Sequence, residues 1–230
     1  MGPNSTIRHI GIILDGNRRW AKKRGLPTLL GHKRGYEKMR AAAQWCAKRE
    51  IKILTVYAFS SENWNRSKKE VDYLMNLFRA GFKNHIGKLT HQGIKIKVIG
   101  QKERLPKDLQ KIIRQAEAQT KNNTKLVFNV AISYGGRPEI VQAVKKIVAK
   151  KIPAAKITEA LLAKNLWTKG LPDPDIIIRT SGEYRLSNFL TWQSAYAELF
   201  FLKKNWPDFS EQDLDQVIKE FNCRQRRFGQ

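Results

Sequence analysis

The sequence predicts one α/β domain in which a mostly parallel sheet of six strands is flanked by helices. Six short apolar segments alternate with longer segments whose apolar residues have helical spacing. No repeat, low-complexity tract or interdomain linker interrupts the 230 residues. Such alternation is typical of parallel sheets with right-handed crossovers and helices on both faces. We therefore expect a single domain over residues 1–230, with a flexible start at residues 1–6.

The strands are predicted from short runs rich in Ile and Val. These runs are mostly apolar throughout, as expected of strands that are buried on both faces. They cover Ile7–Leu14, Ile53–Phe59, Ile94–Ile99, Leu126–Ile132, Asp175–Ile178 and a sixth segment around Leu199–Leu202.

The helices are predicted from apolar stripes between these strands. In one of them, apolar residues recur every three or four positions from Val71 to Ile86. Pro138 stands at the first position of another, where a missing N–H is tolerated. The expected helices are Lys33–Lys48, Lys69–Leu89, Lys107–Lys121, Pro138–Lys150 and Asp213–Phe221.

The formal net charge of +24 predicts an anionic partner, such as nucleic acid, a membrane surface or phosphorylated substrates. Lysines that only solubilise the surface explain much of this charge, because they are spread along the chain. No apolar run approaches the roughly 18 residues that span a bilayer, and no signal-peptide pattern opens the chain. Cys46 and Cys223 lie far apart, which argues against a zinc site or a disulfide framework. We expect a cytoplasmic protein, with peripheral contact at the inner face of the membrane as an option.

Polar segments follow four of the predicted strands directly. Because ligands of parallel sheets bind outside the carboxyl ends of the strands, these segments should converge on one edge. They are Asp15, Ser60–Arg66, Ser133–Arg137 and Arg179–Ser187.

The stretch "IGIILDGNRRWAKKRG" places a carboxylate at the end of the first strand and bases after it. Gly16 allows a sharp turn next to Asp15, and Asn17 can cap the following helix, whose N-terminus attracts phosphate. Taken alone, "DGN" is also the sequence of an ordinary turn. The apolar strand before it and the bases after it favour a ligand site.

The stretch "YAFSSENWNRS" is a loop dense in hydrogen-bond donors. Ser60, Ser61, Asn63 and Arg66 are suited to binding a diphosphate, and Trp64 suits a lid better than a core. A capped turn before the next helix would explain the serines but gives Trp64 and Arg66 no role.

The stretch "DIIIRTSGEYRLSNF" ends a buried strand at Arg179, and Arg185 and Ser187 follow a glycine turn. Two arginines at this spacing suit the bidentate grip that phosphate accepts. Surface salt bridges are the alternative for either arginine alone.

Glu198 lies in the otherwise apolar run "WQSAYAELFF". A carboxylate there must be buried, paired or bound to a metal, because an isolated buried charge is too unfavourable. Two carboxylates that share open positions with substrate phosphates are a common Mg²⁺ site. We therefore expect Asp15 and Glu198 to form one.

Seven blocks together resemble the cis-prenyltransferase family, which comprises undecaprenyl and dehydrodolichyl diphosphate synthases. The blocks occur in colinear order from His9 to Gly229, and their order and ending resemble the bacterial-type homodimeric enzymes. They are "HIGIILDGNRRWAKKRG", "GHKRG", "YAFSSENWNR", "SYGGR", "IIIRTSGEYRLSNFLTWQSAYAELFF", "WPDF" and "RRFG".

The resemblance implies an enzyme that condenses isopentenyl diphosphate onto an allylic diphosphate with Mg²⁺, in a fold with an apolar tunnel. The implied catalytic residues are Asp15 and Asn63, and the implied metal-binding residues are Asp15 and Glu198. The allylic diphosphate would be bound by Gly16, Asn17, Arg18, Arg19, Trp20 and His32. The mobile loop would contribute Ser60, Ser61, Glu62, Trp64 and Arg66. Isopentenyl diphosphate would be held by Arg179, Arg185, Leu186 and Ser187.

Two further implications concern Thr28 and the C-terminus. The family usually has an arginine four residues before His32, where this chain has Thr28, and the extra base Arg18 is available to replace that contact. Residues 222–230 are expected to form a tail at the interface of a homodimer. In that tail Arg227 and Gly229 would reach the partner's isopentenyl diphosphate.

Asn63 stands where the family is assigned a proton acceptor, but a neutral carboxamide is a weak base, and a diphosphate oxygen oriented by Asn63 is the easier acceptor. The expected product is a long-chain cis-polyprenyl diphosphate that carries glycans, made from a farnesyl or geranylgeranyl primer. A short- or medium-chain synthase is the alternative.

Three other functions fit the sequence less well. A nucleic-acid-binding module is supported by the charge alone and lacks the motifs of such modules, so no nucleic-acid partner is expected. A catalytically silent subunit of a heteromeric enzyme would lack the aspartate that is present as Asp15. A nucleotide-dependent phosphotransferase would need a phosphate-binding loop such as GxxxxGK[ST], which is absent.

Overall fold

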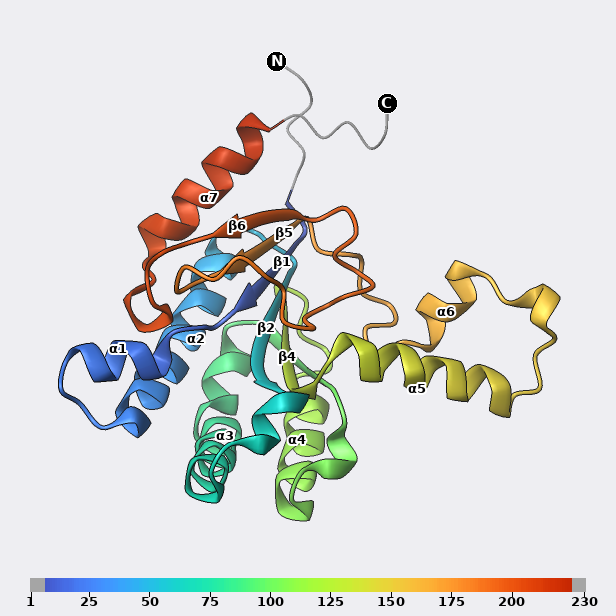
Figure 1. The fold of residues 1–230 in the computed structure, drawn as a ribbon, viewed down its shortest axis with the longest axis horizontal. Coiled ribbons are helices and arrows are strands. Elements are labelled where there is room, and N and C mark those ends of the chain that lie inside the picture. The colour runs from blue at the N-terminus through green and yellow to red at the C-terminus, as the bar shows by residue number, and fades with distance from the viewer. Residues whose placement is uncertain (1–6, 225–230) are drawn as a thin grey trace.

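The computed structural model describes residues 7–224, apart from the side chains of His85 and Lys88. Six strands form one sheet in the order β3-β4-β2-β1-β5-β6, and each of the five neighbouring pairs is parallel (Figure 1). The strands are β1 His9–Ile13, β2 Ile53–Ser60, β3 Ile94–Ile99, β4 Leu126–Tyr134, β5 Ile176–Arg179 and β6 Glu198–Phe201. The predicted α/β fold with a six-stranded sheet is confirmed.

All five predicted helices are present, α1 is the helix expected next to Asn17, and α6 was not predicted. The helices are α1 Asn17–Lys23, α2 Thr28–Lys48, α3 Lys68–His91, α4 Lys107–Gln119, α5 Gly136–Ala149, α6 Glu159–Asn165 and α7 Glu211–Cys223. The helices α1 and α6 have seven residues each, which is too short to show a clear apolar stripe. None of the helices within residues 7–224 is long and apolar enough to cross a membrane.

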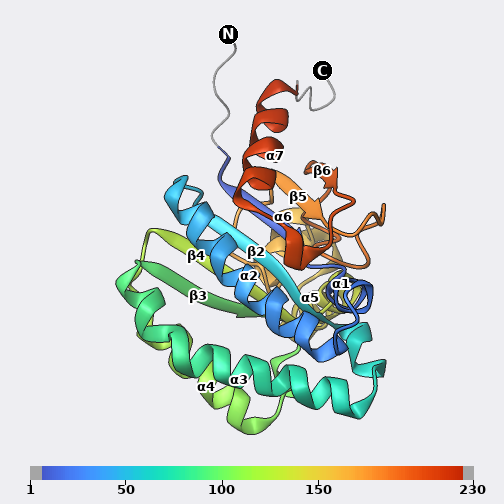
Figure 2. The ribbon, with the colours of Figure 1, turned by 90° about the vertical axis from the view of Figure 1, so that its left-hand side faces the viewer.

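The main hydrophobic core lies on one face of the sheet. Alternate residues of the strands point to it, including Ile10 and Ile12 of β1, because successive strand residues face opposite sides. Apolar residues of α2, α3, α4 and α7 complete this core. Figure 2 shows α2 lying across the strands, with α3 and α4 beside it.

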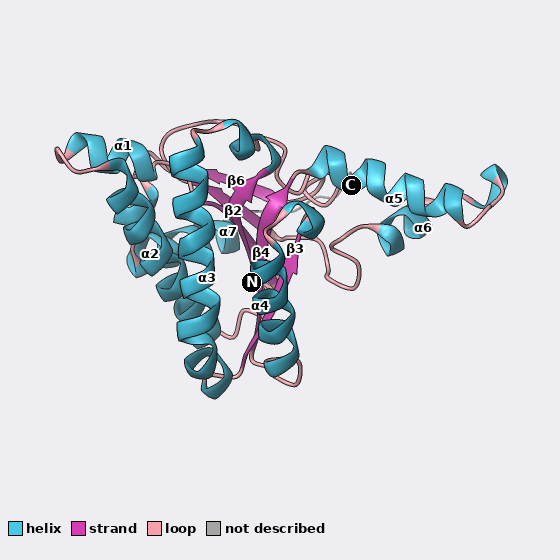
Figure 3. Ribbon diagram, turned by 90° about the horizontal axis from the view of Figure 1, so that it is seen from below, coloured by secondary structure: helices cyan, strands magenta, loops and turns pink. Residues whose placement is uncertain are grey.

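A smaller apolar cluster lies on the opposite face, where Ile13 and Tyr57 point. Its members from outside the strands, Phe189 and Leu190, come from the irregular segment between β5 and β6. We expected helices on both faces, but this irregular segment covers the second cluster. The helices α5 and α6 instead extend away from the sheet, on the side opposite to α1 and α2 (Figures 1 and 3).

Two glycines of α2 let the start of α1 approach closely. A Cβ atom at Gly31 would overlap the carbonyl oxygen of Asn17, and one at Gly35 would overlap its side chain. The residue that caps α1 is Gly16, in a left-handed conformation with φ of 101°. The expectation that Asn17 caps this helix is therefore wrong. Asn17 is the first helical residue, and its Nδ2 donates to the carbonyl of Leu14 at 3.2 Å.

Candidate active site

A cavity of about 1220 Å³ opens at the carboxyl edge of the sheet. The ends of β1, β2 and β5 and the segments after them line it, which confirms the expected convergence of the polar loops. The lining residues that the sequence pointed to are Asp15, Gly16, Asn17, Arg18, Arg19, Thr28, His32, Ser60, Glu62, Asn63, Arg66, Arg179, Leu186 and Ser187.

Asp15 and Arg179 meet because their strands pair in parallel register. Ile13 is the register partner of Arg179, so Asp15 stands two residues beyond the same level of the sheet. Arg179 is only 4% exposed, and its Nη2 donates to Asp15 Oδ2 at 2.9 Å. Its Nη1 donates to Ser187 Oγ at 2.7 Å and to the carbonyl oxygen of Arg185. The arginine is thus fixed between the first strand and the loop after β5.

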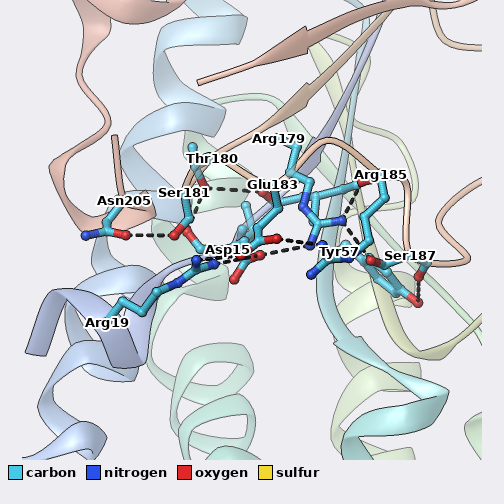
Figure 4. A network of polar contacts seen from close by, with 12 residues as sticks. Asp15, Arg19, Tyr57, Arg179, Thr180, Ser181, Glu183, Arg185, Ser187 and Asn205 are labelled. Carbon is cyan, nitrogen blue, oxygen red and sulfur yellow. Dashed lines mark hydrogen bonds and ion pairs between the residues drawn. The ribbon is translucent and has the colours of Figure 1, made fainter. Parts of the chain in front are cut away.

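Arg19 extends this contact into a chain of alternating charges (Figure 4). Its Nη2 lies 3.2 Å from Asp15 Oδ2, and its Nη1 lies 2.7 Å from Glu183 Oε1. The other oxygen of Glu183 accepts from Arg185 Nη1 at 2.5 Å. Hydrogen bonds from Arg19 and then Arg185 lower the pKa of Glu183, which therefore stays ionised. The sequence analysis did not single out Glu183.

A second carboxylate, Glu70 in the first turn of α3, is contacted by basic side chains from three separate segments. His32 Nε2 and Arg66 Nη1 contact its Oε1 at 3.0 and 2.9 Å, and Arg18 Nη1 lies 3.9 Å from Oε2. Burial lowers the pKa of His32, although Glu70 opposes this shift, so the imidazole is neutral at pH 7. Glu70 was missed because nothing in the sequence pairs residue 70 with residues 18 and 32.

Asn63 belongs to a capping box that fixes the direction of its amide. Ser60 Oγ accepts from the Asn63 backbone N–H at 3.2 Å, and the Ser60 backbone N–H lies 3.1 Å from Asn63 Oδ1. Because a backbone N–H can only donate, the carbonyl oxygen of the amide is committed to Ser60. The amide NH₂ group is left to donate within the cavity that Asn63 lines.

Within residues 7–224, five of the expected site residues do not line the cavity. Trp20 Nε1 donates to Asp208 Oδ1 at 2.7 Å, and the expected role of Trp20 at the allylic diphosphate stays a prediction. Arg185 also lies outside the lining and reaches Arg19 only through Glu183. The full set is Trp20, Ser61, Trp64, Arg185 and Glu198.

Trp64 is a packing residue rather than a lid. Its ring packs edge-on against Phe59 with centroids 5.0 Å apart, and its Nε1 donates to Ser133 Oγ at 2.9 Å. Arg104 covers the ring at 5.2 Å. The expectation of an exposed lid was wrong because the loop is a short 3₁₀ helix, Ser61–Asn65, that turns the indole back onto β4. The neighbouring Ser61 donates to Glu62 Oε2 at 3.0 Å.

Glu198 lies at the opposite end of the sheet from Asp15. It begins β6, where its register partner is Ile176, and Ile176 in turn pairs with Ile10. Ile10 lies three residues before the end of β1 at Ile13, about 10 Å at about 3.3 Å per residue, and Asp15 lies beyond that end. Arg224 Nη1 contacts the Glu198 carboxylate at 2.7 Å. The expectation that Asp15 and Glu198 of one chain bind a common metal is therefore wrong.

One oxygen of Asp15 is free to contact a metal ion. Both arginine contacts go to Oδ2, and Oδ1 has no hydrogen-bond partner in residues 7–224. No group of three or more His, Cys, Asp or Glu side chains that could hold a metal occurs in this part of the chain. A metal held by one carboxylate oxygen and by diphosphate oxygens fits this arrangement, as is common for Mg²⁺.

Several lining residues were not assigned a role from the sequence. Arg137 was expected only as part of a loop at this edge, and Lys22 only as one of the bases after Asp15. Asn188 links three segments, because its side chain bonds Glu62 Oε1 and the backbone N–H of Arg137, at 3.0 and 2.8 Å. The others are Ile13, Leu14, Leu26, Tyr57, Ala58, Leu74, Thr191 and Ser194.

The expected apolar tunnel and the expected contacts of the C-terminus both stay predictions. Leu74 is the one α3 residue in the cavity lining, so a tunnel between α2 and α3 stays a prediction. Near Gly81, a Cβ atom would meet the ring of Tyr36, which occupies the space between these helices. Arg227 and Gly229, like residues 1–6, lie outside the described residues.

The comparisons with known proteins decide the family. A family model described as "Putative undecaprenyl diphosphate synthase" matches residues 13–229. The chain belongs to this family, the cis-prenyltransferases. It is 48% identical to an isoprenyl transferase of Streptococcus pneumoniae, over 99% of this chain and 93% of that one.

Two further relatives show the breadth of this family. A tritrans,polycis-undecaprenyl-diphosphate synthase of Pyrococcus abyssi, described as specific for geranylgeranyl diphosphate, is 49% identical over 96% of this chain and 86% of its own. The crystal structure of lavandulyl diphosphate synthase from Lavandula x intermedia, in complex with dimethylallyl diphosphate, superposes with a TM-score of 0.95. That match has 39% identity and covers 98% of this chain and 99% of the other.

This cis-prenyltransferase is an enzyme that elongates prenyl chains in cis and uses isoprenoid diphosphates. The cavity suits such substrates. Cations from α1, from the loop after β2 and from β5 meet around it, and each isoprenoid diphosphate is strongly anionic.

Proposed function

We propose that this chain catalyses the Mg²⁺-dependent condensation of isopentenyl diphosphate with an allylic diphosphate. The proposed primer is farnesyl or geranylgeranyl diphosphate, and the product is a long-chain cis-polyprenyl diphosphate that serves as a lipid carrier of glycans. The observation that carries the proposal is the position of Asp15 between Arg19 and Arg179, at the edge of a cavity lined by cations.

The two diphosphates are assigned to opposite sides of Asp15. On one side, Gly16 to Arg19 at the start of α1, together with His32, bind the allylic diphosphate. On the other side, Arg179, Arg185 and Ser187 bind isopentenyl diphosphate, since Arg179 already bonds the loop that carries the other two. The carbon–carbon bond forms between these sites, and the allylic diphosphate departs toward the bases of α1.

The free Oδ1 atom of Asp15 supports the Mg²⁺ part of this proposal. When bound there, the ion supplies positive charge to the departing diphosphate. Arg19 and Arg179 hold the carboxylate by its other oxygen and so fix the direction of Oδ1. Arg19 also contributes charge to the leaving group directly, because it lines the cavity.

Asn63 is proposed to orient a diphosphate oxygen that accepts the proton lost from isopentenyl diphosphate. Its carbonyl oxygen is committed to Ser60, and its NH₂ group can donate to an anion. Because a neutral amide oxygen that already accepts a hydrogen bond is a weak base, a diphosphate oxygen is the better proton acceptor. The roles of Ser60, Glu62 and Arg66 are to keep this loop against the cavity.

We further propose a cytoplasmic C2 homodimer in which Arg227 and Gly229 complete the partner's isopentenyl diphosphate site. Arg224 supports this arrangement, because it fixes the end of α7 to Glu198 and Glu220, at 2.7 and 2.6 Å, just before the tail. Peripheral contact with an anionic membrane is consistent with the charge of +24 and would help a long apolar product to leave.

The decisive experiment uses labelled isopentenyl diphosphate, Mg²⁺ and a set of primers from dimethylallyl to geranylgeranyl diphosphate. The products are dephosphorylated and sized by chromatography. Long-chain products with a farnesyl or geranylgeranyl primer support the proposal. Products with one to a few added units favour the short- or medium-chain alternative. If the protein incorporates no label with any primer, the proposed function is refuted.

A further inference from the structure

Glu183 joins the two proposed diphosphate sites through a single carboxylate. Its Oε1 contacts Arg19 Nη1 at 2.7 Å, and its Oε2 contacts Arg185 Nη1 at 2.5 Å. Figure 4 shows Glu183 and Asp15 between Arg19 on one side and Arg179 and Arg185 on the other. Arg19 belongs to α1, whereas Arg185 lies on the loop after β5. The carboxylate thus bridges the groups that would bind different substrates.

The two contacts compete with the substrates for the same donors. Arg19 directs one terminal nitrogen to Glu183 and the other to Asp15. Both terminal nitrogens of its guanidinium are therefore engaged, and a diphosphate that takes both of them in an end-on bidentate contact has to compete with the two carboxylates. Asp15 also contacts the buried Arg179. Glu183 is consequently the carboxylate that is easier to displace.

The position of Glu183 allows its carboxylate to separate from the two arginines. Its side chain is 28% exposed, and the two arginines are its only side-chain partners within the described part of the chain. It follows Ser181 and Gly182, both with positive φ, of 80° and 73°, so it stands at the tip of a tight turn. A carboxylate in this position can rotate into water without uncovering a buried group.

We propose that Glu183 is an internal stand-in for diphosphate that couples the two substrate sites. Before substrates bind, it offsets the positive charges of Arg19 and Arg185. The first diphosphate to bind either arginine turns the carboxylate away, which releases the other arginine as well. The second substrate then binds without having to displace Glu183, so each substrate favours the binding of the other.

This inference rests on the proposed function, because that function assigns the two arginines to different diphosphates. It differs from a purely positioning role, in which Glu183 would orient the arginines for substrate. The two roles have opposite consequences when the charge is removed. Loss of a competitor strengthens diphosphate binding, whereas loss of a positioning group weakens it.

The test is calorimetric titration with inorganic diphosphate, without Mg²⁺, of the wild type, Glu183→Gln and Glu37→Gln. Glu37 is a matched control, because it also pairs with an arginine, Arg34, at 3.0 Å, and it does not line the cavity. We expect Glu183→Gln to bind diphosphate about tenfold more tightly than wild type, since each exposed ion pair changes a binding constant by up to about fivefold. Glu37→Gln should change the affinity by less than about twofold. Equal or weaker binding by Glu183→Gln than by Glu37→Gln would overturn the proposal.

Coupling is measured with isopentenyl diphosphate and a non-reactive thiolo analogue of farnesyl diphosphate. A saturating amount of the analogue should tighten the binding of isopentenyl diphosphate. The factor of tightening should be larger in the wild type than in Glu183→Gln. An unchanged factor would show that Glu183 does not couple the sites.

Glu183→Asp, whose shorter side chain cannot span both arginines, should behave like Glu183→Gln. Thermal melting of each variant checks that it is folded. These measurements need no turnover, so a chain that binds as expected but makes no product refutes the proposed function and leaves this inference standing.

Discussion

The buried guanidinium of Arg179 holds Asp15 by one oxygen, Oδ2, at 2.9 Å. Arg19 contacts the same oxygen from the opposite side at 3.2 Å. The carboxylate is therefore fixed in direction while Oδ1 stays open toward the cavity. The proposed function accounts for the many bases around this aspartate, because in it two anionic substrates lie close together and Asp15 would direct a cation between them.

Replacement of Asp15 by alanine should lower kcat by about a thousandfold or more, which corresponds to roughly 4 kcal/mol of lost transition-state stabilisation. The allylic diphosphate should still bind, because Arg18, Arg19 and the start of α1 remain. Steady-state kinetics and equilibrium binding of the primer measure the two effects separately. Turnover close to wild type would contradict the proposed metal role of Asp15.

Arg179, which ends β5, and Arg185, on the loop after it, should behave differently from each other. Arg185→Ala should raise the KM for isopentenyl diphosphate without a matching change for the primer. Arg179→Ala should raise the same KM and also lower kcat, since Arg179 holds Asp15 in place. Arg34→Ala, an exposed arginine paired with Glu37, serves as the control. If Arg185→Ala and Arg179→Ala both weaken primer binding alone, the two substrate sites have been interchanged.

The close approach of α1 to α2 should tolerate no side chain at Gly31. A methyl group there would overlap the carbonyl oxygen of Asn17, so Gly31→Ala should lower the free energy of unfolding by about 1–3 kcal/mol or more. Gly87→Ala in α3 is the matched control, because a Cβ atom there has no neighbour within 4 Å. It should stabilise the protein by up to about 1 kcal/mol through helix propensity. Chemical denaturation of both variants gives the comparison, and equal effects would contradict the packing argument.

His9 should make the folded state sensitive to acid. Burial lowers the pKa of His9 to about 4, although the Pro172 carbonyl, which accepts from Nδ1, opposes the shift. Because the unfolded chain takes up the proton near pH 6.5 and the folded chain only near pH 4, stability is lost as the pH falls between these values. At pH 5 the loss should be about 2 kcal/mol.

Denaturation curves at pH 7 and pH 5 test this, with His9→Gln as the variant. The glutamine variant should lose less stability between the two pH values than the wild type does. The exposed His91 provides the control variant His91→Gln, which should follow the wild type. A wild-type pH dependence that survives His9→Gln unchanged would exclude His9 as its source.

Subunit mixing should reveal whether the active sites are completed by the partner. In a mixed dimer of Asp15→Ala and Arg227→Ala chains, one site carries both changes and the other carries neither. Activity should therefore return to about half of wild type per mixed dimer, as isologous pairing requires. If the mixture never exceeds the sum of the two separate variants despite proven subunit exchange, Arg227 does not act on the partner's site.

Residues that directly follow a strand were placed correctly from the sequence. Asp15 and Arg179 end or follow apolar strands, and parallel strands bring their carboxyl ends to one edge. The same reasoning places Glu198 at the opposite edge from Asp15, because Glu198 begins β6 and does not follow it. The error came from pairing carboxylates by their chemistry without asking at which edge each one lies.

The strands, the edge that holds the site and the family could be predicted, because they follow from local apolar patterns and from contiguous blocks of residues. The partner of each side chain, in contrast, depends on how the whole chain folds. Trp20 turns to Asp208, Trp64 turns to Ser133, and Glu70 and Glu183 each collect cations from separate segments. The physical reason is that a side chain's direction depends on neighbours far away in the chain, such as residue 208 for Trp20, and no local period encodes them.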